Sequence, residues 1–211
     1  MKIAFIGYGQ VGSALADQLQ RRGHQVTLAA HDATSNSVQR SLQRNPALLV
    51  QSPQSAIHSA EVVFLATPFS ANASVLEDMK QELIGKIVVD CTNPVGAGLS
   101  HGLNSVQSGS EMVQSLIPLS KVVKAFTIYG FENFEDNHFP TYNIKPTMMF
   151  CGNDLEAKLV VSQLISDLAW EPLDVGDLKQ ALHLEHMTLL WIRMVRMQQR
   201  SPYTVWAMLQ K

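Results

Sequence analysis

The chain has 211 residues, of which 46% are hydrophobic and 16% are charged, and its formal net charge is -2. This length fits one large domain or one domain with a small appendage, and the near-neutral charge excludes a global attraction to nucleic acid or to a membrane surface. The two cysteines lie far apart without metal-ligand spacing, and the N-terminus shows no signal-peptide pattern. No apolar run approaches the roughly 20 residues of a membrane-spanning helix. We therefore expect a cytoplasmic, reduced protein.

The first two thirds of the chain alternate short apolar runs with amphipathic segments. The apolar runs, which we interpret as strands, cover residues 2–7, 25–30, 48–50, 61–66, 86–90 and 121–126. Helical spacing falls between them at residues 10–22, 35–43, 53–60 and 72–83, with Ser52 as the expected cap of the third helix. Continuously apolar strands separated by helices are typical of a parallel sheet covered on both faces. We therefore predict a doubly wound α/β domain of the Rossmann type.

The remaining segments extend this sheet and end in helices. Strands are expected at residues 147–152 and 171–175 with a helix at 154–168 between them, so the mostly parallel sheet reaches about eight strands. Asp177 can cap a long helix from residue 178 to about 200, and Pro202 can open a short helix through residue 209. We therefore divide the chain into a Rossmann domain with its sheet extension, residues 1–176, and C-terminal helices, residues 177–211, that pack on it.

A glycine-rich turn joins the first expected strand to the first expected helix. It fits the pattern GxGxxG and comprises Gly7, Tyr8, Gly9, Gln10, Val11 and Gly12. The first glycine permits the tight turn, the second lets the backbone approach a pyrophosphate, and the third lets helix and strand pack closely. The helix N-terminus offers free N–H groups and a positive dipole end to the phosphates. Because strand, turn, helix and second strand follow in the right order, we predict a dinucleotide site, and a turn kept only for packing is the alternative.

The end of the second strand indicates which dinucleotide binds. Ala30 lies 18 residues after Gly12, where an NAD site places a carboxylate on the ribose 2′-hydroxyl. Alanine leaves room there and removes a charge that would repel a 2′-phosphate, and His31 can approach such a phosphate as a donor. Alternatively, His31 is a solvated residue that opens a loop. Asp32 falls two places late for the ribose, so we expect it to be a turn or cap residue. The missing acid also disfavours S-adenosylmethionine, the other ligand of such turns.

Several short runs carry a resemblance to a known family. They are VVFLATP at residues 62–68, KIVVDCTNP at 86–94, VVKAF at 122–126, GNDLEAK at 152–158, EPLDVGDL at 171–178, and LLWI at 189–192 after Leu184-Glu185. In this order they resemble the deazaflavin-dependent NADP oxidoreductases, which include reductases of coenzyme F-420 and the reductase domain of six-transmembrane ferric reductases. The resemblance covers essentially the whole chain. It implies the fold and a bound NADP (or NAD), and it is much less specific about the electron acceptor.

The resemblance assigns cofactor contacts to the glycine turn and to the residues that follow the fourth and fifth strands. The latter are Thr67, Pro68, Phe69, Asn93 and Pro94. These positions follow the carboxyl ends of parallel strands, where ligands bind in open α/β sheets. Strand termination alone would account for the two prolines, but it would leave Thr67 and Asn93 unexplained.

Two positions depart from the family's pattern. The family commonly has Ser-Arg or Thr-Arg where this chain has Ala30 and His31, and it has Phe-Asn-Thr where this chain has Phe-Thr-Ile at residues 126–128. Both the contacts to the 2′-phosphate and the pocket beside the nicotinamide are therefore altered. Thr127 and Tyr129 are our candidates for the wall of the acceptor pocket, and an ordinary loop aromatic is the alternative for Tyr129.

These features predict an oxidoreductase that transfers hydride between a nicotinamide dinucleotide, with NADP favoured, and a small-molecule acceptor such as a flavin or deazaflavin. Such a transfer depends on stacking two rings at near-attack distance. The sequence offers no Tyr-x-x-x-Lys pair or other general acid, so we nominate no catalytic residue. A non-catalytic NADP(H)-binding sensor fits the same residues, whereas the strand ends Thr67-Pro68 and Asn93-Pro94 disfavour methyl transfer.

The last long helix carries candidate ligands and an apolar surface. His183 and His186 are three residues apart but lack a third ligand, so we expect no metal site, and we expect Cys91 to be a buried small hydrophobe. An apolar stripe on this helix comprises Met187, Leu190, Trp191, Met194 and Met197. A helix that is apolar nearly all round must be covered on several sides, so we predict a homodimer. Three arginines at helical spacing make docking on a membrane the less favoured alternative.

Overall fold

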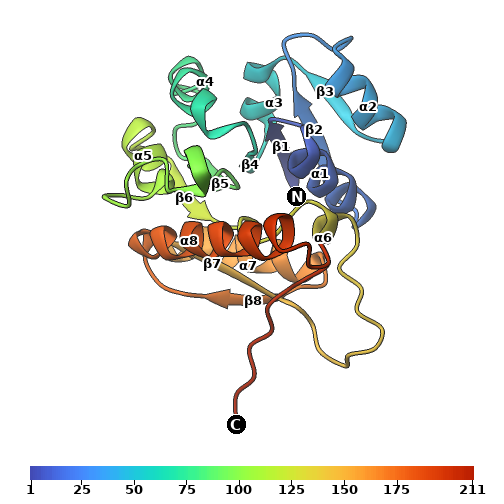
Figure 1. Cartoon of the computed structure of the whole chain (residues 1–211). Coiled ribbons are helices and arrows are strands. Elements are labelled where there is room, and N and C mark those ends of the chain that lie inside the picture. The colour runs from blue at the N-terminus through green and yellow to red at the C-terminus, as the bar shows by residue number, and fades with distance from the viewer.

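The computed structural model describes all 211 residues, which form a single eight-stranded sheet covered by helices (Figure 1). The strands are β1 (Lys2–Ile6), β2 (Gln25–Ala29), β3 (Leu49–Gln51), β4 (Val62–Leu65), β5 (Ile87–Asp90), β6 (Lys121–Lys124), β7 (Thr147–Gly152) and β8 (Glu171–Asp174). Their order is β3-β2-β1-β4-β5-β6-β7-β8, and every neighbouring pair is parallel except β6 and β7. The predicted doubly wound, mostly parallel α/β fold is confirmed.

Helices pack on both faces of this sheet. They are α1 (Gln10–Arg21), α2 (Asn36–Arg44), α3 (Pro53–Ser59), α4 (Asn72–Asp78), α5 (Gly109–Leu116), α6 (Glu132–Glu135), α7 (Leu155–Asp167) and α8 (Ala181–Ile192). Short 3₁₀ turns lie at Phe69–Ala71, Ala97–Leu99 and Leu178–Gln180, and a π-helical turn, Arg193–Met197, continues α8. No helix combines the length and the apolar character that crossing a membrane requires.

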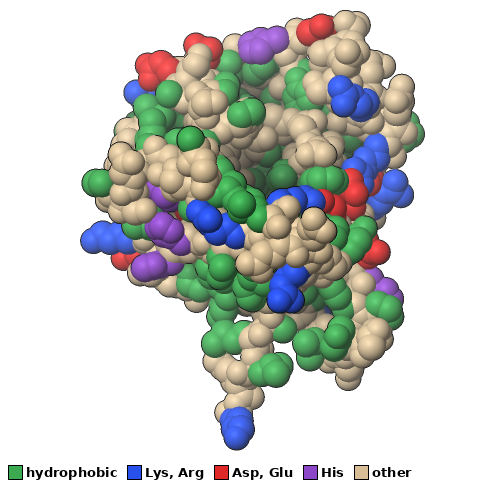
Figure 2. All heavy atoms as spheres, viewed as in Figure 1, with side chains coloured by type: hydrophobic (Ala, Val, Ile, Leu, Met, Phe, Trp, Pro, Cys, Tyr) green, Lys and Arg blue, Asp and Glu red, His purple; other side chains and the backbone are tan.

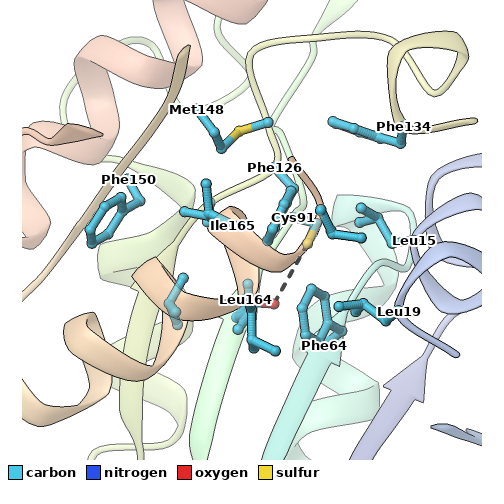
Figure 3. Close-up of a cluster of buried hydrophobic side chains, with 14 of the residues drawn as sticks. Leu15, Leu19, Phe64, Cys91, Phe126, Phe134, Met148, Phe150, Leu164 and Ile165 are labelled. Atoms are coloured by element: carbon cyan, nitrogen blue, oxygen red, sulfur yellow. Dashed lines mark hydrogen bonds between the residues drawn. The ribbon is translucent and has the colours of Figure 1, made fainter. Parts of the chain in front are cut away.

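The central strands are buried on both faces, which explains their continuous apolar sequences. Phe5 of β1 and Phe64 of β4 stack with ring centroids 4.7 Å apart in a cluster of 32 buried residues that also includes residues of α1, α7 and α8. Ala4 and Ile6 point the other way, into a cluster of 16 buried residues beneath α3, α4 and α5. Figure 3 shows the larger cluster, where Phe64 lies among side chains of α1 and α7. Because α8 contributes to this cluster, it belongs to the main core.

The C-terminal segment differs from the prediction. The long helix ends with the π-helical turn at Met197, and residues 202–209 form no helix. They run in extended form beside the start of β7, where the N–H of Thr147 donates to the carbonyl of Trp206 at 2.8 Å and the N–H of Met208 donates to the Thr147 hydroxyl at 3.0 Å. Trp206 and Met208 thus use backbone groups to bind Thr147 of β7 instead of a helical partner, and the predicted final helix is wrong.

Two helices were not anticipated, and one is shorter than expected. Ser108 and Glu111 form a reciprocal capping box at the start of α5, a Ser-x-x-Glu pattern that the sequence does contain. The short α6 lies inside the long loop that precedes β7. The helix expected over residues 72–83 ends at Asp78, and turns complete the segment. The caps predicted at Ser52 and Asp177 are both present.

Candidate functional site

The glycine turn has two glycines fixed by packing and one that is open. Gly7 has a φ of +91°, and a Cβ on it would lie 2.6 Å from the backbone of Ala66 and Thr67 at the end of β4. A Cβ on Gly12 would lie 2.1 Å from the carbonyl oxygen of Gly7. At Gly9, by contrast, a Cβ would meet nothing within 4 Å. The backbone at Gly9 is therefore exposed to an approaching ligand, and only there does the turn leave space.

The N-terminus of α1 is free to bind an anion. No side chain caps this helix, and its first internal hydrogen bond runs from the N–H of Ser13 to the carbonyl of Gly9 at 2.9 Å. The N–H groups of Gln10, Val11 and Gly12 precede that bond, so they have no helical partner. Unpaired N–H groups and the positive end of the helix dipole together form a phosphate-binding site.

A cleft of about 340 Å³ lies beside this turn and follows the carboxyl ends of β1, β2 and β4. The predicted residues that line it are Gly7, Tyr8, Gly9, His31, Thr67 and Pro68. Ser37, near the start of α2, lines it too and was missed by the sequence analysis. Figure 2 shows that the molecule is hollowed near the middle of this view, with hydrophobic and uncharged atoms in the depression.

At the end of β2, the structure corrects which side chain faces the cleft. Ala30 is buried and does not line the cleft, and its N–H donates to the carbonyl of Gln51 at 2.9 Å. Ala29 and the exposed His31 line the cleft instead. No acid lines the cleft at the end of β2, as predicted, but the space that we assigned to Ala30 is bordered by Ala29 and His31.

Asp32 and Tyr8 complete this end of the cleft. Asp32 accepts hydrogen bonds from the hydroxyl of Thr34 at 2.6 Å and from its N–H at 2.8 Å, and these bonds lower the pKa of Asp32. Asp32 is thus the turn residue that we predicted. Burial raises the pKa of Tyr8, the nearby charge of Asp32 adds to the increase, and a hydrogen bond with Ser35 opposes it. The phenol of Tyr8 therefore stays protonated beside the glycine turn.

The carboxyl ends of β4, β5 and β6 are joined by side-chain hydrogen bonds. The hydroxyl of Thr67 donates to the amide oxygen of Asn72 at 2.7 Å. The hydroxyl of Thr127 donates to the amide oxygen of Asn93 at 2.6 Å, and Thr188 of α8 donates to the carbonyl of Thr127 at 2.9 Å. The structure therefore brings the predicted Thr67, Asn93 and Thr127 to one end of the sheet, and the bonds explain why these side chains are polar.

Phe69 and Pro94 lie together over the start of α5. A Cβ on Gly109 would lie 2.7 Å from the ring of Phe69 and 3.2 Å from Pro94. The two residues, which follow different strands, therefore form one apolar contact with α5. Neither lines the 340 Å³ cleft, so they border the site on its β5 side.

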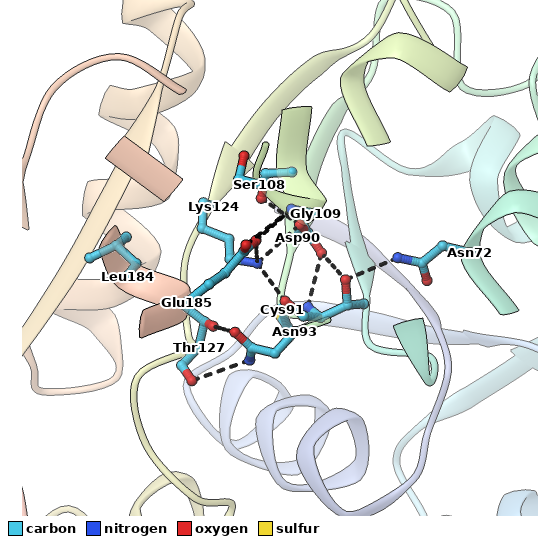
Figure 4. A network of polar contacts seen from close by, with 12 residues as sticks. Asn72, Asp90, Cys91, Asn93, Ser108, Gly109, Lys124, Thr127, Leu184 and Glu185 are labelled. Atoms are coloured by element: carbon cyan, nitrogen blue, oxygen red, sulfur yellow. Dashed lines mark hydrogen bonds and ion pairs between the residues drawn. The ribbon is translucent and has the colours of Figure 1, made fainter. Parts of the chain in front are cut away.

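A buried network of charged side chains, missed by the sequence analysis, lies beneath these loops (Figure 4). Lys124 at the end of β6 lies 3.3 Å from Asp90 at the end of β5 and 3.1 Å from Glu185 of α8, and it also donates to the carbonyl of Thr92. Glu185 accepts a hydrogen bond from Nε2 of His101 at 2.8 Å. The side chains of Asp90, Lys124, Glu185 and His101 are at most 2% exposed. We call these four residues the buried charge network.

Known proteins resemble the chain in both sequence and fold. Residues 2–94 match the family described as NADP oxidoreductase coenzyme F420-dependent. The F420-dependent NADP reductase of Methanocaldococcus jannaschii is 30% identical over 208 residues, and the match covers 91% of each protein. The chain belongs to this family. A crystal structure assigned as an F420-dependent NADP reductase from an Arthrobacter species superposes with a TM-score of 0.83 at 27% identity, covering 94% of this chain and 95% of that one.

A relative from rat is much longer than this chain and matches most of it. Metalloreductase STEAP3 of Rattus norvegicus is 31% identical over 189 residues, which are 89% of this chain but 36% of the relative. The chain thus spans about a third of the metalloreductase. Both comparisons agree with the resemblance inferred from the sequence, and the relatives named in the family are NADP-dependent oxidoreductases.

One predicted pocket residue of this family member lies elsewhere. Tyr129 is 4% exposed and stacks on Trp170 with ring centroids 5.0 Å apart, and its hydroxyl donates to the carbonyl of Thr147. Burial raises its pKa, and the hydrogen bond with the Trp206 backbone opposes this. Tyr129 therefore holds β7 and the C-terminal segment together, which agrees with the alternative that it is a structural aromatic of the loop. The loop after β6 turns inward at this point, which the sequence did not indicate.

The histidines and cysteines considered as metal or redox residues are packed or buried and form no metal site. No group of three or more His, Cys, Asp or Glu side chains is arranged to hold a metal ion. His186 stacks on His101 with ring centroids 5.3 Å apart. Cys91 and Cys151 are free and buried, and burial raises the pKa of both thiols, that of Cys151 to about 12. Cys91 is the buried small residue that we expected, and it lies in the larger core cluster.

Proposed function

We propose that this chain binds NADP(H) in the cleft and transfers hydride between its nicotinamide and a flavin, deazaflavin or similar acceptor. The single observation that supports this most directly is the space at Gly9 beside the uncapped N-terminus of α1. The residues fit a dinucleotide there, because a pyrophosphate needs both the close backbone and the free N–H groups. The family relationship supports NADP as the dinucleotide.

In this proposal, the strand order fixes which half of the dinucleotide lies where. The order reverses between β1 and β4, and a dinucleotide lies across that crevice. The adenosine half then lies toward β2, near His31 and Ser37, where a ring N–H and a hydroxyl can donate to a 2′-phosphate. The nicotinamide half lies toward β4, β5 and β6, near Thr67, Asn93 and Thr127.

The protein's contribution to hydride transfer in this proposal is orientation and exclusion of water. When bound, the nicotinamide supplies the hydride and the acceptor ring receives it. Thr67 and Asn93, held by their hydrogen bonds, fix the position of the ring, and Phe69 and Pro94 provide apolar contact at the border. No group is assigned as a general acid, because hydride transfer between stacked rings requires none at the point of transfer.

A panel experiment tests the proposal. Tight binding of NADPH, followed in stopped flow by its oxidation with a flavin, with a deazaflavin or with a ferric chelate, is the expected result, and the fastest acceptor identifies the class. Tight binding without oxidation by any acceptor would favour the alternative, a non-catalytic NADP(H) sensor. Failure to bind NADPH or NADH would refute both functions.

A further inference from the structure

We propose that the buried charge network places a fixed negative charge under the nicotinamide end of the cleft and thereby favours bound NADP⁺ over bound NADPH. The proposal rests on the function proposed above, in which the nicotinamide lies at the ends of β4, β5 and β6. The nicotinamide ring is neutral in NADPH and positive in NADP⁺, so hydride loss to the acceptor creates a positive charge. A nearby negative charge stabilises that product and the transition state leading to it.

The hydrogen bonds of Asp90 are those that a carboxylate makes. One of its oxygens accepts from the N–H of Thr92 at 2.9 Å and from the Thr92 hydroxyl at 2.7 Å. The other accepts from the hydroxyl of Ser110 and from Lys124. Asn72 donates to the Thr92 hydroxyl at 2.9 Å, so that hydroxyl is left to donate to Asp90. A carboxylate surrounded by donors on both oxygens is held in its charged form.

Glu185 has the same kind of surroundings. Both of its oxygens accept from the N–H of Gly109, at 2.9 and 3.0 Å, while Lys124 approaches one of them and His101 donates to the other. Every close partner of this carboxylate is thus a donor, as at Asp90. Burial disfavours the charged form of Lys124, but the charges of Asp90 and Glu185 outweigh burial and raise the pKa of Lys124. Lys124 is therefore an ammonium.

His101 contributes no charge. Its Nδ1 accepts hydrogen bonds from the N–H groups of Leu103 at 3.3 Å and Ser105 at 3.2 Å. A nitrogen that accepts cannot carry a proton, so the proton sits on Nε2, which donates to Glu185. The network therefore holds two carboxylates against one ammonium, a surplus of one negative charge. The N-terminus of α5 at Gly109 offsets about half of that surplus through its dipole.

The surplus charge is connected to the cofactor loops and is shielded from water. Asp90 and Lys124 are 0% exposed, so solvent screens their field little. A chain of hydrogen bonds runs from Asp90 through Thr92 and Asn72 to Thr67. Asn93, which faces Thr127, follows Thr92 directly in the chain. The charge thus lies just behind the residues assigned to the nicotinamide end.

The expected effect is a change in the ratio of two affinities. A unit charge acting across about 10 Å at an effective dielectric constant of about 20 changes the ratio of NADP⁺ to NADPH affinity roughly ten-fold. The dissociation constants of both nucleotides are measured by titration calorimetry for the full chain and for Glu185→Gln and Asp90→Asn, which remove a charge at nearly constant shape. Each variant is expected to lose about ten-fold in its preference for NADP⁺ relative to the wild type. Thermal unfolding and circular dichroism confirm that each variant is folded.

Two further variants separate electrostatics from structure. His101→Gln keeps a neutral donor to Glu185, so its affinity ratio is expected to equal that of the wild type. Lys124→Met removes the opposing charge, and when it folds its ratio is expected to shift toward NADP⁺, opposite to the carboxylate variants. Equal weakening of both nucleotides in Glu185→Gln and Asp90→Asn would overturn the proposal and leave the network a purely structural role. Wild-type protein that binds neither nucleotide would instead refute the proposed function.

Discussion

Replacing Gly9 with alanine tests the dinucleotide site without disturbing the fold. Gly9 has a φ of -71°, which alanine adopts readily, and the added Cβ meets no protein atom within 4 Å. The free energy of unfolding is therefore expected to change by less than about 1 kcal/mol. In the complex, however, the methyl group would occupy the space through which a pyrophosphate reaches the N-terminus of α1. The variant is thus expected to be stable and defective in binding.

The size of the binding defect follows from the contacts at risk. A hydrogen bond to a charged group contributes about 1.5–3 kcal/mol, so losing one contact between a phosphate and the N–H groups after Gly9 weakens NADPH roughly ten- to hundred-fold. Fluorescence titration with NADPH measures the affinity, and urea unfolding measures the stability. Gly12→Ala is the matched control, because its Cβ would lie 2.1 Å from the carbonyl oxygen of Gly7 and should reduce both stability and binding. Wild-type affinity in Gly9→Ala would show that no pyrophosphate sits at this turn.

Four further predictions follow from individual side chains. His31→Ala should lower the affinity for NADPH relative to NADH, because the ring N–H can donate to a 2′-phosphate, and an unchanged preference in the variant would exclude this contact. Cys91 and Cys151 should resist iodoacetamide at neutral pH until urea unfolds the protein, because burial raises both pKa values, and rapid alkylation of the native protein would contradict this. Tyr129→Phe removes one buried hydrogen bond, so it should lower the free energy of unfolding by about 1 kcal/mol and leave the affinity for NADPH unchanged. Weakened NADPH binding in this variant would instead support a place for Tyr129 in the pocket. If the chain is a homodimer through α8, Leu190→Glu should give monomers in sedimentation, since Leu190 is 49% exposed, and monomers already in the wild type would refute the dimer.

The elements that the sequence predicted well are those with local signals. Strands β1, β4 and β5 are buried on both faces, so their apolar runs are nearly continuous, and the glycine turn sits between a strand and a helix. The prediction for the segment around Trp206 failed because its conformation depends on a distant partner. Pro202 suggests a helix start locally, but the backbone of Trp206 bonds to Thr147, which is far away in sequence. Local pattern therefore cannot reveal that this segment is extended.

In the candidate site, too, features with a local sequence signal were predicted and features set by distant contacts were not. The sequence identified the residues at the ends of β4 and β5 that come together, because parallel strands bring their carboxyl ends to one edge. The buried charge network joins residues from β5, β6 and α8, and its pairing is a tertiary property. One signal was present nonetheless: Lys124 stands within the apolar run VVKAF, and a lysine in a central strand must be buried with a partner. The two interpretations of Tyr129 could not be separated from the sequence, because nothing local shows that the loop turns inward.

The pairing of Lys124 also bears on the order in which the molecule can assemble. Asp90 and Lys124 come from neighbouring strands, but Glu185, which completes the charge balance, comes from a helix formed much later in the chain. Until α8 docks, this end of β5 and β6 must remain hydrated, because a charge buried without its partners is strongly destabilising. Residues 1–176 alone would lack that helix, so Lys124 would have no contact with Glu185. Docking of α8 is therefore the step that completes the set of partners around Lys124.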